Sequence, residues 1–338
     1  MPALTLRLRA GGLAAAAALV LAACAPALPQ PAPAAVPAVP PPVLTVDQSQ
    51  RVLAAISVNL ATGDKALAST GVSTRLTGPA LASRAAEYAM VHATAGVDRL
   101  TPLDLKAQTL VVPTTDVWPR TAFVVTQQPE DLSSPQLLVL QQAAPRSQYL
   151  LWGWARLLPG VKMPATAAPA VGSAPLSDNA TGLVASPKDV VARYSDVLTN
   201  GNLSTYAASF ASPDSYRARI ETAKGPLIAV ASSVGGTFTQ SYAPVAGQTF
   251  ALATADGGAL VVAGMSTWSV VKFSGATISL TADLASLSGG ALGTGASLRN
   301  DLTVAFTDVV AFYVPPAGGS APIQVLGAEH VRTSVTGS

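Results

Sequence analysis

The stretch ALVVAGMSTWSVVKF, Ala259–Phe273, has the alternating pattern of a long β-strand rich in β-branched residues. It directly follows Asp256-Gly257-Gly258, a sequence that favours a tight hairpin turn. Similar runs lie on both sides of it, namely TFTQSYAP (237–244), TFALATA (249–255), TISLTA (277–282), LTVAFTDVVAFYV (302–314) and IQVLGAEHVRTSV (323–335). The sequence therefore predicts a series of hairpin-linked strands over the last hundred residues.

Helical patterns precede the strands, and they do so in two halves of the chain. Thr45 and Gln48 have the spacing of a capping box, and the helical pattern after them is expected to end at Gly63. Ser186 is a second helix cap, followed by Pro187 and by a pattern that ends at Gly201. The two openings superpose at a constant offset of 138 residues. Shorter helical patterns come next, at 65–68 and 79–92 in the first half and at 204–211 and 213–230 in the second.

Strand patterns also come after the helices of the first half, as TLVVP (109–113), TAFVVTQQ (121–128), QLLVLQQ (136–142) and YLLWGWARLL (149–158). Helices followed by hairpin-linked strands indicate an α+β fold, with helices packed on a curved antiparallel sheet. We therefore predict two tandem domains, 45–160 and 186–338, joined by the Pro, Ala and Gly-rich linker 161–185. The second domain is long enough to bury a core of its own.

The N-terminal region contains Cys24, the only cysteine of the chain. Arg7 and Arg9 precede an eleven-residue apolar run, which is too short for a membrane span and typical of a signal peptide over 1–23. Residues 24–44 read as a stalk, since eight prolines between 25 and 42 favour an extended polyproline conformation.

Leu21, Ala22 and Ala23 before the cysteine resemble the lipobox of bacterial lipoproteins. The resemblance implies cleavage after Ala23, lipidation of Cys24 and attachment to the outer face of the bacterial cell membrane. The alternative is an ordinary secretory signal with an incidental cysteine.

The layout of the whole chain, together with stretches such as LTGPALASRAAEY (76–88), carries a second resemblance. It is similar to tandem cystatin-like domains of the nuclear transport factor 2-like superfamily, in which helices cover a bent sheet around a cone-shaped cavity. Lipobox, stalk and duplicated domain together resemble uncharacterised actinobacterial lipoproteins with a domain of unknown function. This resemblance implies a location and a fold but no activity.

Composition excludes several classes of function. Without Arg7 and Arg9 the chain has 18 basic and 18 acidic residues, so nothing favours nucleic acid as a partner. One cysteine and two histidines, His92 and His330, cannot form an intrachain disulfide or a usual structural zinc site. We expect no metal and no cofactor.

Two short stretches match sequence motifs of known enzymes, but their positions in the chain do not suit catalysis. Ser269 and Lys272 have the Ser-x-x-Lys spacing of penicillin-binding proteins, but on a strand they point to opposite faces. Ser177-Asp178-Asn179 matches a second element of those enzymes, yet it lies in the predicted linker, and no Lys-Thr-Gly comes after it. We interpret both matches as chance.

Glu329 and His330 are neighbours on the last predicted strand. They should point to opposite faces, so that at most one faces the interior and they cannot act as an acid/base pair on one substrate. His92, at the end of a helical pattern, is expected at the surface. Asp116 and Asp308 are expected to be exposed strand carboxylates, and every Asp and Glu of 186–338 is expected to titrate normally. Tyr313 cannot be oriented from the pattern.

The four tryptophans lie in or near predicted strands. Trp152 and Trp154 are two residues apart and should share one face. Trp118 and Trp268 lie near other strands, and aromatics with this spacing are usually core residues. The alternative is the lining of a cavity for an apolar ligand.

These features favour a non-catalytic, membrane-anchored lipoprotein of the cell envelope that binds a partner protein or a small apolar ligand. A solute-binding lipoprotein of an importer is the first alternative, although such proteins alternate strands and helices around parallel sheets. An enzyme built on the cone fold is the second, and it would need a buried carboxylate or tyrosine in the cavity with a perturbed pKa.

Overall fold

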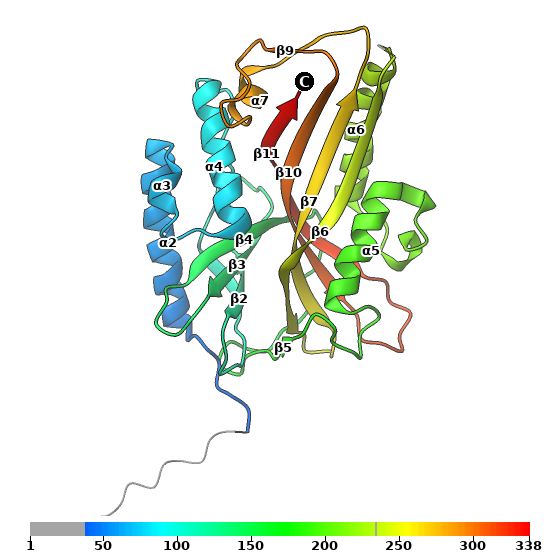
Figure 1. The fold of residues 1–338 in the computed structure, drawn as a ribbon. Helices are drawn as coiled ribbons and strands as arrows, with labels where there is room; N and C mark the ends of the chain where they lie inside the picture. Colours follow the sequence, from blue (N-terminus) through cyan, green and yellow to red (C-terminus); the bar gives the residue numbers. More distant parts are fainter. Residues whose placement is uncertain (1–37, 234) are drawn as a thin grey trace, which may run out of the picture. The chain divides into compact units, whose positions relative to one another are not determined.

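The computed structural model describes residues 38–233 and 235–338, of which Val39–Ser338 form one compact unit (Figure 1). The predicted signal peptide, Cys24 and most of the predicted stalk lie outside the described residues. The last residues of that stalk belong to the unit, since the backbone N–H of Val43 donates to the carbonyl of Pro113 and Leu44 is buried.

One curled sheet organises the unit. Its strands lie in the order β1-β2-β3-β4-β11-β10-β7-β6-β5, and every adjacent pair is antiparallel. They are β1 (Ala107–Val111), β2 (Arg120–Thr126), β3 (Gln136–Gln142), β4 (Leu150–Leu157), β5 (Pro175–Leu176), β6 (Thr237–Ala253), β7 (Ala259–Lys272), β10 (Asp301–Val314) and β11 (Gln324–Gly337). A small second sheet pairs β8 (Ile278–Ser279) with β9 (Ser297–Leu298).

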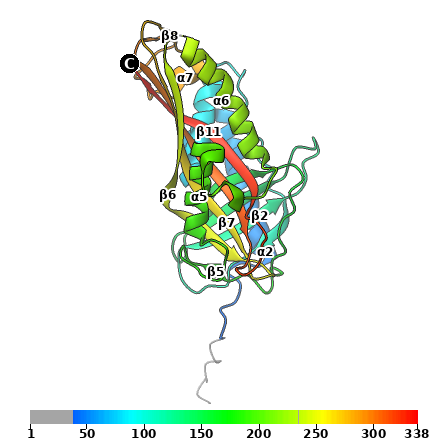
Figure 2. The same cartoon turned by 90° about the vertical axis from the view of Figure 1, so that its right-hand side faces the viewer.

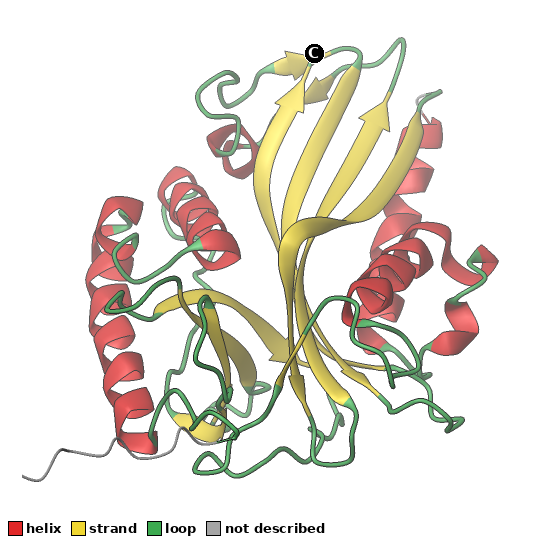
Figure 3. Cartoon of the chain, turned by 60° about the horizontal axis from the view of Figure 1, so that its bottom comes forward, coloured by secondary structure: helices red, strands yellow, loops and turns green. Residues whose placement is uncertain are grey.

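Helices cover this sheet from two sides (Figure 3). They are α2 (Val46–Ala66), α3 (Ser69–Val72), α4 (Gly78–Ala93), α5 (Pro187–Asn200), α6 (Ser215–Ser233) and the short α7 (Ala282–Ser286), with 3-10 turns at Gly201–Leu203 and Ala207–Ser209. The predicted α+β class, with helices on a curved antiparallel sheet, is confirmed.

Local sequence explains where the helices begin. The capping box is present, because the Thr45 N–H donates to Gln48 Oε1 at 2.8 Å and the Gln48 N–H donates to Thr45 Oγ1 at 3.2 Å. Ser186 likewise accepts from the Asp189 N–H at 3.2 Å. The prediction that Gly63 ends the first helix is wrong, because α2 continues to Ala66.

Glycine at position 63 is explained by helix packing and not by the end of the helix. A Cβ at this position would lie 2.2 Å from Val72 Cγ1 and 2.9 Å from the Tyr88 hydroxyl. The missing side chain therefore allows α3 and α4 to pack closely against α2, and the helix ends only where Leu67 takes a left-handed conformation.

The core has three main layers. Figure 2 views the molecule from the side of α5 and α6, which lie in front of the sheet. One face of β1–β4 packs against α2 and α4, and one face of β6, β7 and β10 packs against α5. The opposite faces of both parts pack against each other, through residues such as Phe123, Val139, Leu260, Val309 and Leu326. Both halves of the chain thus share a core layer.

The predicted division at 161–185 is therefore not a division into separate units. Ser173 in this stretch is buried, its N–H donates to the carbonyl of Val112 and its own carbonyl accepts from Thr114. Ala174 accepts from the Ala253 N–H, and Val184 donates to Pro315. The stretch closes the curled sheet by connecting the end of β1 to β5 and β6.

Strand β4 contains a bulge that overturns one prediction. The register with β3 runs from Val139 opposite Gly153 to Leu140 opposite Leu151, so Trp152 is the extra residue. Trp154 consequently belongs to the layer beneath α4, whereas Trp152 belongs to the layer shared by both halves. The two tryptophans are core residues as predicted, but they do not share a face.

Candidate ligand-binding cavity

A cavity of about 550 Å³ lies between α6 and the sheet. Its walls come from α6, from the ends of β6, β7, β10 and β11 near the C-terminus, and from Leu284 of α7. In Figure 1 these strand ends extend beyond the level of β2–β4. The lining is mainly apolar, with Ile220, Leu227, Phe238, Val271, Leu302 and Val304 among its residues.

A buried network of hydrogen-bonded side chains, Thr267, Asp308 and His330, lies beside this cavity. Asp308 is fully buried and accepts a hydrogen bond from the Thr267 hydroxyl at 2.5 Å, while its other oxygen pairs with Nδ1 of His330. The imidazole of His330 stacks on Phe306, with ring centroids 4.1 Å apart, and both residues line the cavity. The prediction that Asp308 is exposed is wrong, because the ladder places it opposite His330 on the face that α6 covers.

Tyr216 of α6 lines the same cavity and is completely buried. Among the described residues its hydroxyl has no hydrogen-bond partner. Burial raises the pKa of Tyr216 well above its ordinary value of 10, and the negative charge of Asp308 adds to the effect. A buried polar atom without a partner is costly, so a ligand group that reached this hydroxyl would supply the missing hydrogen bond.

Ser269 lies on the sheet wall of the cavity, where its hydroxyl accepts from Gln240 Nε2 at 2.8 Å. Gln240 in turn accepts from the Tyr242 hydroxyl at 3.0 Å. Lys272 is exposed, and the strand period places it on the other face. The two residues therefore do not form a catalytic pair.

Three cationic side chains line the cavity. Arg332 pairs with Asp283 at 2.5 Å, and Lys224 pairs with Glu221 at 3.1 Å while also donating to the carbonyl of Leu198. The ion pairs found in the described part of the chain do not include Arg219, whose guanidinium lies 5.4 Å from the centre of the Tyr216 ring.

Glu329 lies on the opposite face of β11 from His330, as the strand period predicts. Both residues nevertheless line a smaller pocket of about 250 Å³ beside β11, because only Gly327 and Ala328 of this strand pair with β4. Their side chains are both largely covered, so the prediction that at most one faces the interior is wrong.

The environment of Glu329 also contradicts the expectation of ordinary titration. Burial raises the pKa of Glu329 from its ordinary value of 4.5 to about 7, against the opposing effect of Arg156. Its Oε2 atom is buried without a hydrogen-bond partner in the described structure. The strand pattern places Glu329 correctly on β11. It could not predict that Glu329 is buried, because the burial depends on α4, which packs against this strand.

A buried charge cluster on α4 was missed altogether. Arg84 is 1% exposed and donates to Glu87 Oε2 at 2.9 Å and to the carbonyl of Thr101 at 3.0 Å. Glu87 also accepts from the Thr101 hydroxyl at 2.5 Å, and burial raises its pKa despite the neighbouring Arg84. One signal was present in the sequence, because Arg84 and Glu87 occupy positions on the apolar stripe of their helix.

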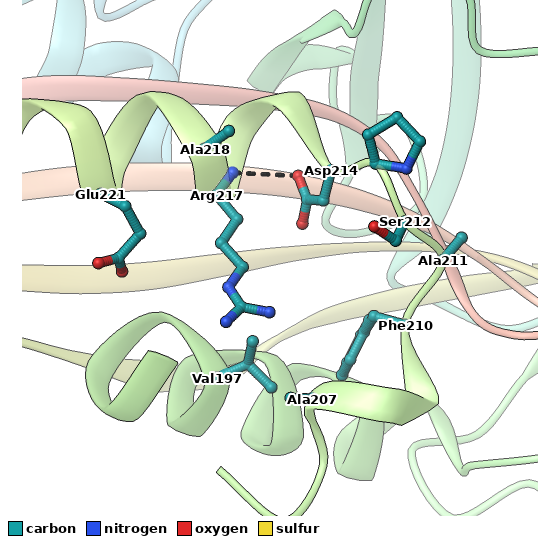
Figure 4. Close-up of a pocket in the computed structure, with 10 residues that line it drawn as sticks. Val197, Ala207, Phe210, Ala211, Ser212, Asp214, Arg217, Ala218 and Glu221 are labelled. Carbon is teal, nitrogen blue, oxygen red and sulfur yellow. Dashed lines mark hydrogen bonds between the residues drawn. The ribbon is translucent and has the colours of Figure 1, made fainter. Parts of the chain in front are cut away.

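A smaller pocket of about 260 Å³ lies between α5 and α6 (Figure 4). Its charged residues are engaged in local contacts: Asp214 accepts from the backbone N–H of Arg217, and the Arg217 side chain donates to Asn202 at 2.6 Å. These contacts stabilise the start of α6, so this pocket is a weaker candidate for a ligand site than the apolar cavity.

The remaining sequence candidates lie apart from the cavity. Asp116 and His92 are exposed, as predicted, and so is Ser177. Tyr313 donates to Asp256 at 2.5 Å beside the hairpin turn. Trp118 packs its ring against Arg120 and donates to Gln142 at 3.0 Å. Trp268 is 39% exposed and is not a core residue.

None of the described helices has both the length and the apolar character that a membrane span requires. Neither the curated proteins nor the solved structures compared with this chain gave a match. The model of one family, a domain of unknown function termed DUF8094, matches residues 40–337, almost the whole described unit. The chain belongs to this family.

Proposed function

We propose that this protein is a lipid-anchored component of the bacterial cell envelope that binds a small apolar ligand in the cavity beneath α6 without transforming it. The observation that carries the proposal is the cavity of about 550 Å³ with its mainly apolar lining. Its volume is within the usual range for small-molecule sites, and such sites combine apolar walls with a few polar groups. The lipobox-like sequence around Cys24 supports the anchor and the location on the outer face of the membrane.

We also propose that the two halves are tandem copies of one cystatin-like α+β domain, as in the lipoproteins that the sequence resembles. Each half has helices followed by four main strands in sequence order along the sheet, β1–β4 in one and β6, β7, β10 and β11 in the other.

The importer alternative receives less support. Solute-binding proteins of that kind build lobes from alternating strands and helices around parallel sheets. The strand ladders of residues 38–233 and 235–338 are antiparallel.

The alternative of a protein partner is favoured by three apolar side chains on the surface of α6. Leu227, Ile228 and Val230 are between 45% and 65% exposed.

One observation favours an enzyme as the second candidate function. The buried Asp308 orients His330 through Nδ1, which is the arrangement that fixes a histidine tautomer in general acid/base catalysis. Ser269, also on the cavity wall, is hydrogen-bonded to Gln240 and not to the imidazole, so it is not placed as a nucleophile for His330. Turnover would therefore require a substrate whose own proton His330 removes.

Binding can be tested with N-phenyl-1-naphthylamine, a probe that fluoresces in apolar sites, on the unit Val39–Ser338, which contains the whole described core. We expect saturable binding that Val304→Trp weakens, because the indole would occupy part of the cavity. Val230→Trp adds the same group at an exposed position of α6 and should leave binding intact. Equal binding by both variants would contradict the proposed site.

The catalytic alternative needs a separate measurement. Ligand extracted from protein prepared from its native membrane, incubated with fresh protein and analysed by mass spectrometry, should be recovered unchanged. Chemical conversion that disappears in His330→Asn would support the enzyme instead.

A further inference from the structure

We propose that the ligand of the cavity is a long-chain fatty carboxylate, whose acyl chain lies along the apolar walls and whose carboxylate is bound by Tyr216 and Arg219. This inference rests on the proposed function, since it names the class of ligand that the same cavity takes. It is carried by the charge of the lining and by one unsatisfied buried hydroxyl.

The charges around the cavity favour an anion. Arg219, Lys224 and Arg332 line it together with His330, and no acidic side chain lines it within the described ranges. Asp283 neutralises Arg332, and Glu221 lies beside Lys224. Arg219, whose side chain is exposed at the rim of the cavity lining, is left to attract a negative group of the ligand.

A donor without an acceptor lies next to this cation. The Tyr216 hydroxyl is buried and has no partner in the part of the chain that the structure describes, while the Arg219 guanidinium lies 5.4 Å from the same ring. A carboxylate has two oxygens and can accept from both groups at once. The ligand would therefore satisfy the hydroxyl that the protein leaves unpaired.

Asp308, whose charge raises the pKa of Tyr216, does not compete for this position. Asp308 is fully buried, is not part of the lining, and already accepts from Thr267 and pairs with His330. Phe306 covers one face of the imidazole. The other polar groups of the lining have partners, since Ser269 is hydrogen-bonded to Gln240, and Lys224 and Arg332 are paired with Glu221 and Asp283.

The rest of the cavity suits an unbranched acyl chain. Leu227 and Phe238 contribute apolar surface from α6 and β6, and Val271, Leu302 and Val304 contribute it from β7 and β10. Leu302 also belongs to the cluster that α7 forms with α4, so the chain would end against packed side chains. Burial of methylene groups would supply most of the affinity, and the headgroup would supply the selectivity.

The test compares three probes with the same twelve-carbon chain, namely laurate, dodecanol and dodecyltrimethylammonium, by displacement of N-phenyl-1-naphthylamine below their micellar concentrations. We expect laurate to bind at least about tenfold more tightly than the other two, since two charge-assisted hydrogen bonds are made only by the carboxylate. Equal binding of all three would overturn the fatty carboxylate while leaving the proposed function intact. Failure of all three, and of the naphthylamine itself, would overturn both.

Matched variants locate the headgroup. Arg219→Gln and Tyr216→Phe should each weaken the binding of laurate by about tenfold and leave the binding of dodecanol unchanged. Arg217→Gln, two residues before Arg219 and outside the lining, should change neither. If Arg219→Gln and Tyr216→Phe, both folded by circular dichroism, bind laurate like the unchanged protein, the assigned headgroup position is wrong.

Discussion

Replacing Glu329 by glutamine tests whether a buried carboxyl group lowers the stability of this fold at neutral pH. Burial raises the pKa of Glu329 from 4.5 to about 7, so the folded state binds its proton more tightly than the unfolded state does. Stability from this group is therefore fully present below about pH 4.5, decreases as the pH rises towards 7, and is constant above that value. At 1.36 kcal/mol per pH unit, the difference corresponds to about 3 kcal/mol.

Glutamine has nearly the same shape and no charge. We expect Glu329→Gln to unfold at higher urea concentration than the unchanged protein at pH 8, with a gain of up to about 3 kcal/mol, and to differ little at about pH 4.5. The pH dependence of groups that do not interact with Glu329 is common to both proteins and cancels in the difference. Glu87 does not cancel, because its charge raises the pKa of Glu329 and the two groups are coupled.

Urea unfolding of Val39–Ser338 at several pH values measures this difference directly. Glu130→Gln is the control, because Glu130 is exposed, and its stability difference should not depend on pH. A loss of stability in Glu329→Gln at pH 8, or a gain that is equal at both pH values, would refute the reasoning.

Three further predictions concern the anchor, the closing segment and the charge cluster. Cys24→Ala should leave unprocessed precursor and release processed chain from the membrane fraction, as fractionation and mass spectrometry would show; a processed protein that still sediments with membranes would exclude the lipid anchor. Native proteolysis should spare the residues around Ser173, whose backbone is hydrogen-bonded, and early cleavage there would restore the interpretation of 161–185 as a linker. Arg84→Met should cost about 3–5 kcal/mol in urea unfolding because it leaves Glu87 buried without its cation, and adding Glu87→Leu should recover part of the loss; equal stability of both variants would contradict this coupling.

Features that depend on neighbouring residues were predictable from the sequence. The capping box at Thr45, the cap at Ser186 and the end of α5 at Gly201 agree with the structure, because each is made within a few residues. The pattern over 136–142 matches β3. The pattern over 79–92 matches α4 to within one residue at each end.

Features that depend on register between distant strands were not predictable. Burial of Asp308 depends on Thr267 and His330, which lie 41 and 22 residues away in the chain. The bulge at Trp152 adds one residue to β4, and a single added residue reverses the faces of all later residues in a strand. The sequence pattern also separated 237–244 from 249–255, whereas the structure joins them in the single irregular strand β6.

The candidate site was predictable only in outline. The sequence indicated a bent sheet under helices and therefore a place where a cavity could form. It did not indicate Tyr216 or Arg219 as lining residues, because their positions depend on how α6 lies over strands that come later in the chain. The apolar stripe of α6 is also weak, and only Tyr216, Ile220 and Ala231 are buried along its 19 residues.

Closure of the sheet through Ser173 affects how the molecule can behave among its own copies. An open sheet ends in strands with unpaired backbone groups, which can pair with the same strands of another molecule and start aggregation. Here Ser173 is hydrogen-bonded to the chain after β1, and β5 pairs with Ala251 and Leu252 of β6, so the two margins of the sheet are joined at this end. Strand exchange with another copy is therefore blocked at this end of the sheet.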